Sequence, residues 1–319
     1  MAEPTASLAR AQEEPRRGGP AVHGALLVVQ VAFASQAVEA KIAMLPRDQG
    51  GEGIPVMALA MARMLAGAVF FLLFLRLRVL GRARREEEPP LGLRDHARLF
   101  GLSLLGITLN QALFLAGLGR TTPFAASLLS VTIPIYTATL SVAFRLEKAR
   151  ARTALGLALA VAGVLVLTGI QAVDQGAALV ALNSLVYAGY VVFSKRTIER
   201  LGALRVVSWV FFWGALTFLP FGLGPLVHAL PEVRSRGLWL LVYILLVPTI
   251  VAYLLNAWAL GRSTPTLVTV YIYLQPLIAG LLAYAQLGQR LSARMGAAAA
   301  LILVGVGVVA SRRADPGKA

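Results

Sequence analysis

The chain has 319 residues, of which 58% are hydrophobic and only 14% are charged. Its mean hydropathy of +0.73 exceeds what a water-soluble domain of this size can bury in one core. The net charge is +15 and there is no cysteine, which excludes disulfides and thiolate metal sites. These values place most of the chain in a lipid bilayer.

Ten long and nearly uncharged runs divide the chain. Most reach the roughly 20 apolar residues of a membrane-spanning helix, whereas a barrel strand shows about 10 residues of alternating polarity. Because a helix satisfies its own backbone in lipid, the sequence predicts an all-α integral membrane protein with ten transmembrane helices. The runs are 22–44, 53–75, 99–119, 121–144, 153–173, 175–194, 206–227, 237–261, 263–289 and 295–311.

The two ends of the chain are rich in charge, proline and glycine. Residues 1–21 are therefore predicted to form a disordered cytoplasmic tail, and residues 312–319 a second cytoplasmic tail. Because a polar stretch precedes the first apolar run, we do not expect that run to be a cleaved signal peptide.

The basic charge has a topological explanation. With the N-terminus inside, most of the 30 Lys and Arg residues fall in the tails and loops on the inner side. The positive-inside rule then predicts both termini in the cytoplasm, and we expect an integral protein of a bacterial cytoplasmic membrane. The charge gives no reason to expect a nucleic-acid partner.

A short motif occurs twice. The segment "GRTTP" at Gly119–Pro123 recurs as "GRSTP" at Gly261–Pro265, and the same offset superposes Pro134 on Pro276. This indicates a duplicated unit, with a first repeat at 22–173 and a second at 174–311. Because each repeat holds five predicted helices, the second must enter the membrane upside down, so the halves are expected to be inverted copies.

The loop after the fourth predicted helix supports this inversion. The segment "RLEKARAR" carries four cations, whereas its partner "LGQRLSAR" carries two and lacks the acid. Opposite sides of a membrane place opposite charge demands on a loop. Inverted repeats are typical of alternating-access transporters, which bind solute near the midplane.

The repeated pattern also resembles a known family. A turn, a small-residue helix with a central proline and a glycine-containing helix read "TTPFAASLLSVTIPIYTATLSVAFRLEK" and "GLALAVAGVLVLTG", and again "STPTLVTVYIYLQPLIAGLLAYAQLGQRLSARMGAAAALILVGVGVV". Over residues 22–311 this is similar to the EamA-type permeases of the drug/metabolite transporter superfamily. The resemblance implies a central cavity lined by helices 1, 3, 4, 6, 8 and 9. Glu147 matches the usual acid after helix 4, whereas Gln289 departs from it and is assigned no charge-dependent role.

Enzymatic motifs are weak. The segment "GVGVVA" from Gly305 fits a dinucleotide fingerprint, but no strand precedes it, and close helix packing explains its glycines better. The sequence has no G-x-x-x-x-G-K-[ST] segment. His23, His96 and His228 fall at helix ends or in loops, which argues against a metal cluster or a hydrolase. We expect no enzymatic activity, no cofactor and no metal.

Polar residues inside the predicted helices are the candidate cavity residues, because burying an unpaired amide costs roughly 2 kcal/mol or more. Each amide could instead serve an interhelical hydrogen bond, and each tyrosine could pack in the core or at the membrane interface. Their clustering on helices 1, 3, 6, 8 and 9 favours a shared cavity. The candidates are Gln30, Gln36, Asn110, Gln111, Asn183, Tyr187, Tyr253, Asn256, Tyr271, Tyr273 and Gln275.

One cation lies deep in a predicted helix. Arg63 is about eight residues into helix 2, roughly 12 Å below the outer surface at a rise of about 1.5 Å per residue. Glu39 lies in the outer part of helix 1. Because an intramembrane charge needs a counter-ion, the sequence predicts a Glu39–Arg63 ion pair, either as a structural clasp or as part of an outer gate. Lys41 is expected to reach the interface.

Pro134 and Pro276 interrupt equivalent helices of the two repeats and are predicted hinges, with packing kinks as the alternative. We expect a secondary transporter, an exporter of a small organic metabolite or drug-like solute. The mostly neutral candidates favour a zwitterionic or moderately polar solute. Proton or exchange coupling and a monomeric or homodimeric state stay open. The rival function is a channel or a non-transporting scaffold, although no helix shows the strongly polar stripe that a channel needs.

Overall fold

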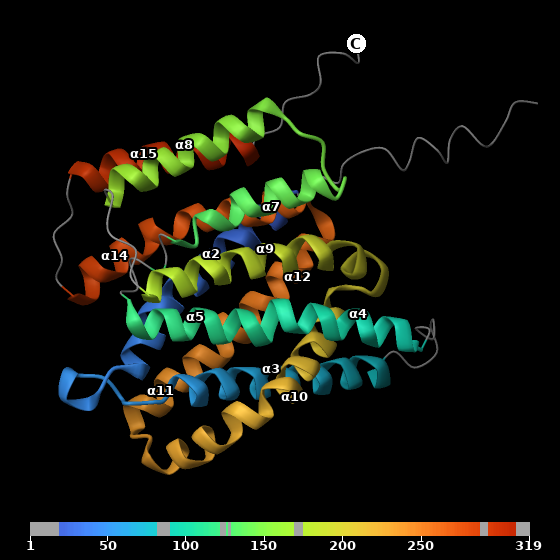
Figure 1. Ribbon diagram of the computed structural model, residues 1–319, viewed down its shortest axis with the longest axis vertical. Helices are drawn as coiled ribbons and strands as arrows, with labels where there is room; N and C mark the ends of the chain where they lie inside the picture. Colours follow the sequence, from blue (N-terminus) through green and yellow to red (C-terminus); the bar gives the residue numbers. More distant parts are fainter. Residues whose placement is uncertain are drawn as a thin grey trace, which may run out of the picture.

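The computed structural model describes residues 19–81, 90–121, 126, 129–168, 175–287 and 293–310. Within them every regular element is a helix (Figure 1). The two predicted tails lie outside the described residues except for residues 19–21, and so do Thr122, Pro123 and Gln289.

The helices overlap the predicted runs with shifted boundaries, and the number of ten spanning helices stays a prediction. In chain order they are α2 (Pro20–Met44), α3 (Val56–Gly81), α4 (Leu93–Ser103), α5 (Leu109–Arg120), α7 (Thr132–Ala143), α8 (Ala151–Thr168), α9 (Gln175–Leu201), α10 (Ala203–Ala229), α11 (Ser235–Ile244), α12 (Ala252–Arg262), α13 (Pro265–Val270), α14 (Gln275–Leu287) and α15 (Ala293–Ala310). The helix α2 begins at a proline, whose missing N–H costs nothing at a first position.

Seven helical segments among the described residues are long and apolar enough to cross a membrane. They are Pro20–Met44, Val56–Leu77, Leu93–Arg120, Ala178–Leu201, Ala203–Glu232, Ser235–Arg262 and Pro265–Leu282. Three shorter apolar helices are Thr132–Ala143, Ala151–Gly163 and Ala300–Val309. The prediction of an all-helical membrane protein is confirmed at this level.

Two of the long segments contain a π-helical stretch near their middle. The stretch η2 (Leu104–Thr108) joins α4 to α5, and η4 (Leu245–Val251) joins α11 to α12. Each contains a residue that departs from regular helix packing: Gly106 faces the Tyr190 ring so closely that a Cβ there would lie 2.4 Å from it, and Pro248 lacks a backbone donor. The repeat offset that superposes Pro134 on Pro276 places η2 on η4 almost in register.

Both predicted hinge prolines follow an interruption of the helix. Pro134 is the third residue of α7, directly after a turn at Ser130 and Val131. Pro276 is the second residue of α14, directly after the 3-10 stretch η5 (Tyr271–Leu274). A proline is well tolerated at the start of a helical segment, because no intrahelical bond is lost there. Their role as hinges stays a prediction.

The helices pack in a regular set of pairs (Figure 1). The closest partners are α8 with α15 and α3 with α10, followed by α5 with α9, α7 with α9, α2 with α12 and α2 with α14. In this view α8 and α15 lie side by side at the top. Their backbones approach closely at small residues, because a Cβ on Gly156 would lie 2.8 Å from the carbonyl oxygen of Gly305. Close helix packing therefore accounts for Gly156, whereas a Cβ at Gly307 of the predicted packing segment would meet nothing within 4 Å.

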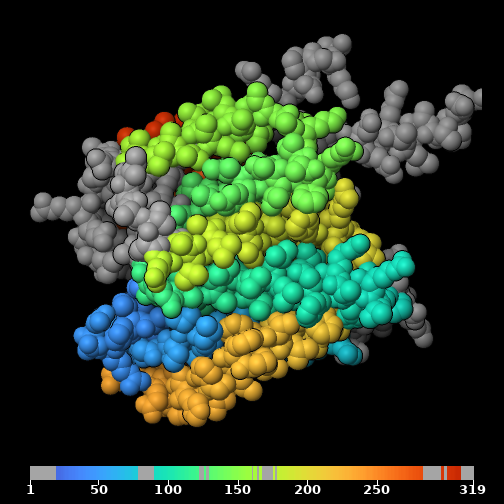
Figure 2. All heavy atoms as spheres, viewed as in Figure 1, coloured from blue at the N-terminus to red at the C-terminus, as the bar shows by residue number. Residues whose placement is uncertain are grey.

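The buried core runs through the middle of these pairs and includes Leu59, Phe71, Phe211 and Tyr273. On the face shown in Figure 2, side chains of neighbouring helices meet without a wide groove between them. A contact between the two predicted repeats is made by Glu147, whose Oε1 accepts hydrogen bonds from N (3.0 Å) and Oγ1 (2.9 Å) of Thr266. A carboxylate at this place stabilises the free N–H groups at the start of α13.

Candidate functional site: a polar cavity around Arg63

A cavity of about 70 Å³ lies among α2, α3, α5, α7, α9, α12, η5 and α14. It is smaller than the pockets of roughly 300–1,000 Å³ that hold drug-sized molecules. Its walls combine amides, aromatic rings and one cation. They are formed by Phe33, Gln36, Arg63, Asn110, Gln111, Phe114, Ser130, Ile133, Asn183, Tyr187, Tyr253, Ile272 and Gln275.

Most of the predicted polar residues meet at this cavity. It is lined by Gln36, Asn110, Gln111, Asn183, Tyr187, Tyr253 and Gln275. Of the remaining candidates, two bond to lining residues. Gln30 Oε1 accepts from Gln275 Nε2 at 2.7 Å, and Asn256 Nδ2 donates to the hydroxyl of Tyr187 at 3.0 Å.

Two predicted tyrosines lie elsewhere. Tyr271 makes a hydroxyl hydrogen bond with Nδ1 of His23. Tyr273 is fully buried, and its hydroxyl has no partner among the described residues. For these two residues the contacts are those of helix packing.

Arg63 is the centre of the polar network. Its side chain is buried, with 1% of the residue exposed. The guanidinium donates from Nε to Thr249 Oγ1 at 2.9 Å, from Nη2 to Gln36 Oε1 at 3.0 Å, and from Nη1 to Gln111 Oε1. All three acceptors are neutral, and they come from three different helical segments.

A second layer of hydrogen bonds surrounds one of these acceptors, Gln111. Gln111 Nε2 donates to the Tyr253 hydroxyl at 2.6 Å, and that hydroxyl donates to Asn110 Oδ1 at 3.4 Å. Asn183 Nδ2 donates to the backbone oxygen of Asn110 at 2.8 Å. The network thus fixes α5 against α9 and α12 around the guanidinium.

Among the described residues, the ion pairs do not include the predicted one between Glu39 and Arg63. The residue of α2 that faces Arg63 is Gln36, which lies about 4.5 Å further from the end of that helix than Glu39 at about 1.5 Å per residue. Glu39 was predicted because its charge is opposite to that of Arg63. The turns of α2 instead place the amide of Gln36 at the guanidinium.

Lys41 binds the end of a neighbouring helix. Its Nζ donates to the backbone oxygens of Leu118 (3.0 Å), Gly119 (3.2 Å) and Thr121 (2.9 Å) at the end of α5. A cation there satisfies the free carbonyls and the negative end of the helix dipole.

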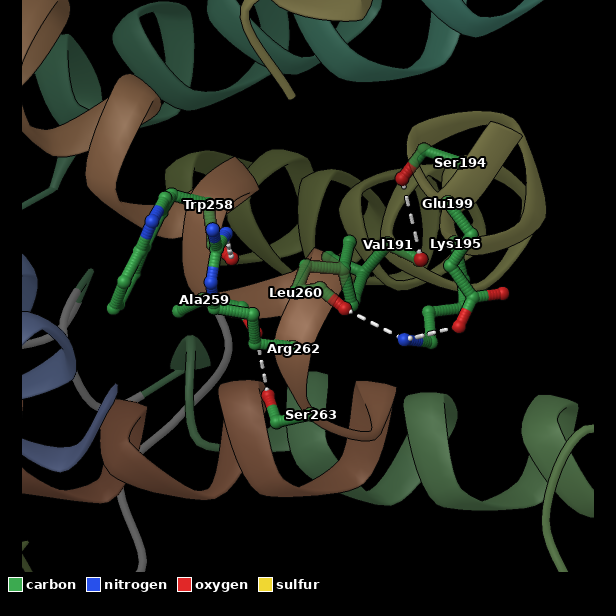
Figure 3. Close-up of polar contacts among 9 residues, drawn as sticks. All are labelled: Val191, Ser194, Lys195, Glu199, Trp258, Ala259, Leu260, Arg262 and Ser263. Carbon is green, nitrogen blue, oxygen red and sulfur yellow. Dashed lines mark hydrogen bonds and ion pairs between the residues drawn. The ribbon is translucent and has the colours of Figure 1, made fainter. Parts of the chain in front are cut away.

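Lys195 does the same at the end of α12 (Figure 3). Its Nζ donates to Leu260 O at 2.8 Å and pairs with Glu199 Oε1 at 2.9 Å. Nearby, the guanidinium of Arg262 lies 4.4 Å from the ring centre of Trp258. The repeat offset superposes Leu118 on Leu260, so the two lysines bind equivalent carbonyls.

Several residues of the cavity were not predicted from the sequence. Thr249 gave no signal because a threonine in an apolar helix usually bonds its own backbone, and this one does so as well, to Ile244 O at 2.8 Å. The neighbouring Pro248 was the available hint, since it marks the π-helical stretch. The other missed lining residues are apolar or small, and their positions depend on packing: Phe33, Phe114, Ser130, Ile133 and Ile272.

The fold and the cavity define a helical integral membrane protein with a polar cavity between its helices. The chain belongs to the EamA-like transporter family. The model of that family matches it twice, at residues 23–169 and at residues 174–311.

Individual relatives agree with this assignment. Protein WALLS ARE THIN 1 of Arabidopsis thaliana is 27% identical over 70% of this chain and 68% of its own length. The uncharacterized transporter YdfC of Bacillus subtilis is 28% identical over 75% and 77%, and the uncharacterized inner membrane transporter YedA of Escherichia coli is 27% identical over 76% and 78%. A protein of known crystal structure shares the fold, with a TM-score of 0.64 at 17% identity, over 90% of this chain and 96% of that one.

Proposed function

We propose that the chain is a secondary transporter that carries a small organic solute through the Arg63 cavity by alternating access. The observation that carries the proposal is the cavity around Arg63, where polar side chains from many segments converge between membrane-length helices. A cavity of about 70 Å³ is too small for most organic solutes, so binding must accompany an opening of the helices.

We further propose that the repeats 22–173 and 174–311 are inverted copies. In this scheme α2, α3, α4–α5, α7 and α8 correspond to α9, α10, α11–α12, α13–α14 and α15. Exchanging the copies maps the α3–α10 and α8–α15 contacts onto themselves, and the α5–α9 contact onto α12–α2. The π-helical stretches and the two lysines correspond in the same way. Such an exchange supports a two-fold axis between the halves.

The transport proposal is tested by counterflow. Purified full-length protein is reconstituted in liposomes loaded with a mixture of small organic solutes, and exchange for labelled solutes outside is followed by mass spectrometry. A carrier shows exchange that exceeds net flux and saturates, whereas a channel shows neither. Loading from either side also tests the export direction predicted from the sequence.

A matched pair of variants links transport to the cavity. Ser130→Phe fills the cavity, whereas Val142→Phe adds the same ring at an exposed position of α7. We expect exchange to be lost in the first variant and kept in the second. If wild-type liposomes exchange no more solute than empty ones, or if Ser130→Phe exchanges at the parental rate, this function is wrong for the cavity.

A further inference from the structure

Arg63 carries a positive charge inside the protein that no acid of the described residues pairs with. A guanidinium keeps its charge in proteins, and a buried charge is costly unless an opposite charge neutralises it. No ion pair among the described residues involves Arg63. Its three acceptors are two amide oxygens and a hydroxyl, which solvate the cation but leave the site with a net charge.

Arg63 is also the single charged residue of the cavity wall, as far as the structure describes the chain. Its three hydrogen bonds use three of the five guanidinium N–H groups. One N–H on each terminal nitrogen is left without a protein acceptor among the described residues. Within the described part of the chain, the guanidinium is therefore held by three hydrogen bonds and keeps two further donors.

Gln36 adds a further donor to the same place. A guanidinium can only donate, so the amide of Gln36 must turn its oxygen toward Arg63. Its NH2 group then points away from Arg63, and Nε2 makes no hydrogen bond within the described part of the chain. Gln36 lines the cavity. The site thus offers positive charge and spare N–H donors, which is the chemistry that binds an oxyanion.

The rest of the wall is suited to an uncharged body. Phe33, Phe114, Ile133 and Ile272 supply apolar and aromatic surface. No carboxylate lines the cavity in the described residues, so the ammonium group of a zwitterion would lack an anionic partner. One cation balances one negative charge, which favours a monoanion over a phosphate ester of charge near −2.

We propose that Arg63 binds the carboxylate of a monoanionic organic solute, with the aromatic and aliphatic wall holding its apolar body. This rests on the proposed transport function, because it names the substrate class of the same cavity. It differs from the preference for a zwitterionic or moderately polar solute, which the sequence suggested because the candidate residues are mostly neutral.

The first test needs no variant. Thermal unfolding of the full-length protein in detergent is measured with acetate, benzoate and 3-phenylpropionate, with their amides, with 3-phenylpropylamine and with phenyl phosphate. We expect the aromatic carboxylates to stabilise the protein at concentrations about tenfold or more below those of the amides, since charged hydrogen bonds are the stronger ones. Equal effects of acid and amide, or a preference for the amine or the phosphate, would overturn the proposal.

The second test neutralises the site. Gln36→Glu keeps the size and the oxygen acceptor at Arg63 but supplies the missing negative charge, so the fold should be at least as stable. We expect benzoate binding to weaken by about tenfold to a hundredfold, with neutral amides unaffected. Arg63→Gln should lose the same selectivity, whereas Arg76→Gln, an exposed change on α3, should keep it. If Gln36→Glu binds benzoate as well as the wild type, the proposal fails.

The two proposals fail differently. If the protein exchanges neutral or cationic solutes in the counterflow assay but does not bind carboxylates, the transport proposal is supported and the anion site is wrong. If carboxylates bind through Arg63 but no solute is exchanged, the anion site is supported and the carrier function is wrong.

Discussion

Arg63 shows how far a single residue can be understood from the sequence. A cation so deep in an apolar run indicates a functional or structural site, and its depth in the membrane follows from its position in the helix. Its partners do not follow, because an amide oxygen at Gln36 or Gln111 can replace a carboxylate at close range. Which of these side chains faces the guanidinium depends on the rotation of α2 and α5, and a uniformly apolar helix gives little information on rotation.

At the residue scale, Gly106 offers a sharp test of packing. A Cβ at Gly106 would lie 2.4 Å from the Tyr190 ring, whereas a Cβ at Gly101, on the same membrane segment, meets nothing within 4 Å. We expect Gly106→Ala to destabilise the protein by about 1–3 kcal/mol through overpacking and Gly101→Ala to be neutral or slightly stabilising. Thermal unfolding of both variants checks this. Similar melting temperatures for the two would mean that α9 moves aside easily.

At the scale of elements, the sequence predicted where helices are interrupted, but it did not predict the type of every interruption. Pro134 and Pro276 marked the breaks in α7 and α14, because proline has a fixed local effect. The π-helical stretches η2 and η4 were not predicted, since an extra residue per turn arises from tertiary contacts such as the Gly106–Tyr190 approach. The two breaks in each half nevertheless fall at equivalent positions, where a change of helix direction can be absorbed.

The lysines Lys41 and Lys195 lead to a prediction about these elements. Each ties one helix to the carbonyl end of another, and in the inverted arrangement the first tie is outside and the second inside. We expect Lys41→Met to favour outward opening and Lys195→Met inward opening, because charge-assisted hydrogen bonds are lost at one end only. The readout is labelling of a Ser130→Cys reporter by an impermeant maleimide added to each side of the membrane.

The control for this experiment is Arg196→Met, which removes an exposed cation beside Lys195. It should leave the labelling pattern unchanged. An increase on the same side for both lysine variants would rule out opposite gates.

For the whole molecule, the composition was sufficient to predict a membrane protein, and the repeated sequence pattern was sufficient to predict its family. Apolar runs and their charged ends follow from the cost of placing charge in lipid, so the helices could be predicted in order. The pairing of α3 with α10 and of α8 with α15 could not, because it depends on which small residues let two backbones meet. The cavity was predictable as a set of polar residues, seven of which line it, but its size and its apolar wall were not.

The inverted topology makes a prediction at this scale. Lys148 and Arg290 are superposed by the repeat offset and occupy equivalent places after the fourth and ninth predicted helices. We expect Lys148→Cys to react with an impermeant thiol reagent only from the cytoplasm and Arg290→Cys only from outside. The chain has no native cysteine, so each label reports one position. Reaction of both from one side would exclude the inverted repeat.

Because Arg63 carries a buried charge, the conformational equilibrium of the protein depends on the membrane potential. One elementary charge that crosses the whole electric field gains or loses about 2.3 kcal/mol at about 100 mV. A rocking motion that carries the guanidinium through a tenth of the field therefore shifts the empty protein by about 0.2 kcal/mol. With a monoanion bound at Arg63 the moving charge is close to zero. The voltage then affects the conformational change of the empty protein and not that of the loaded protein. An inside-negative potential favours the inward position of the empty site.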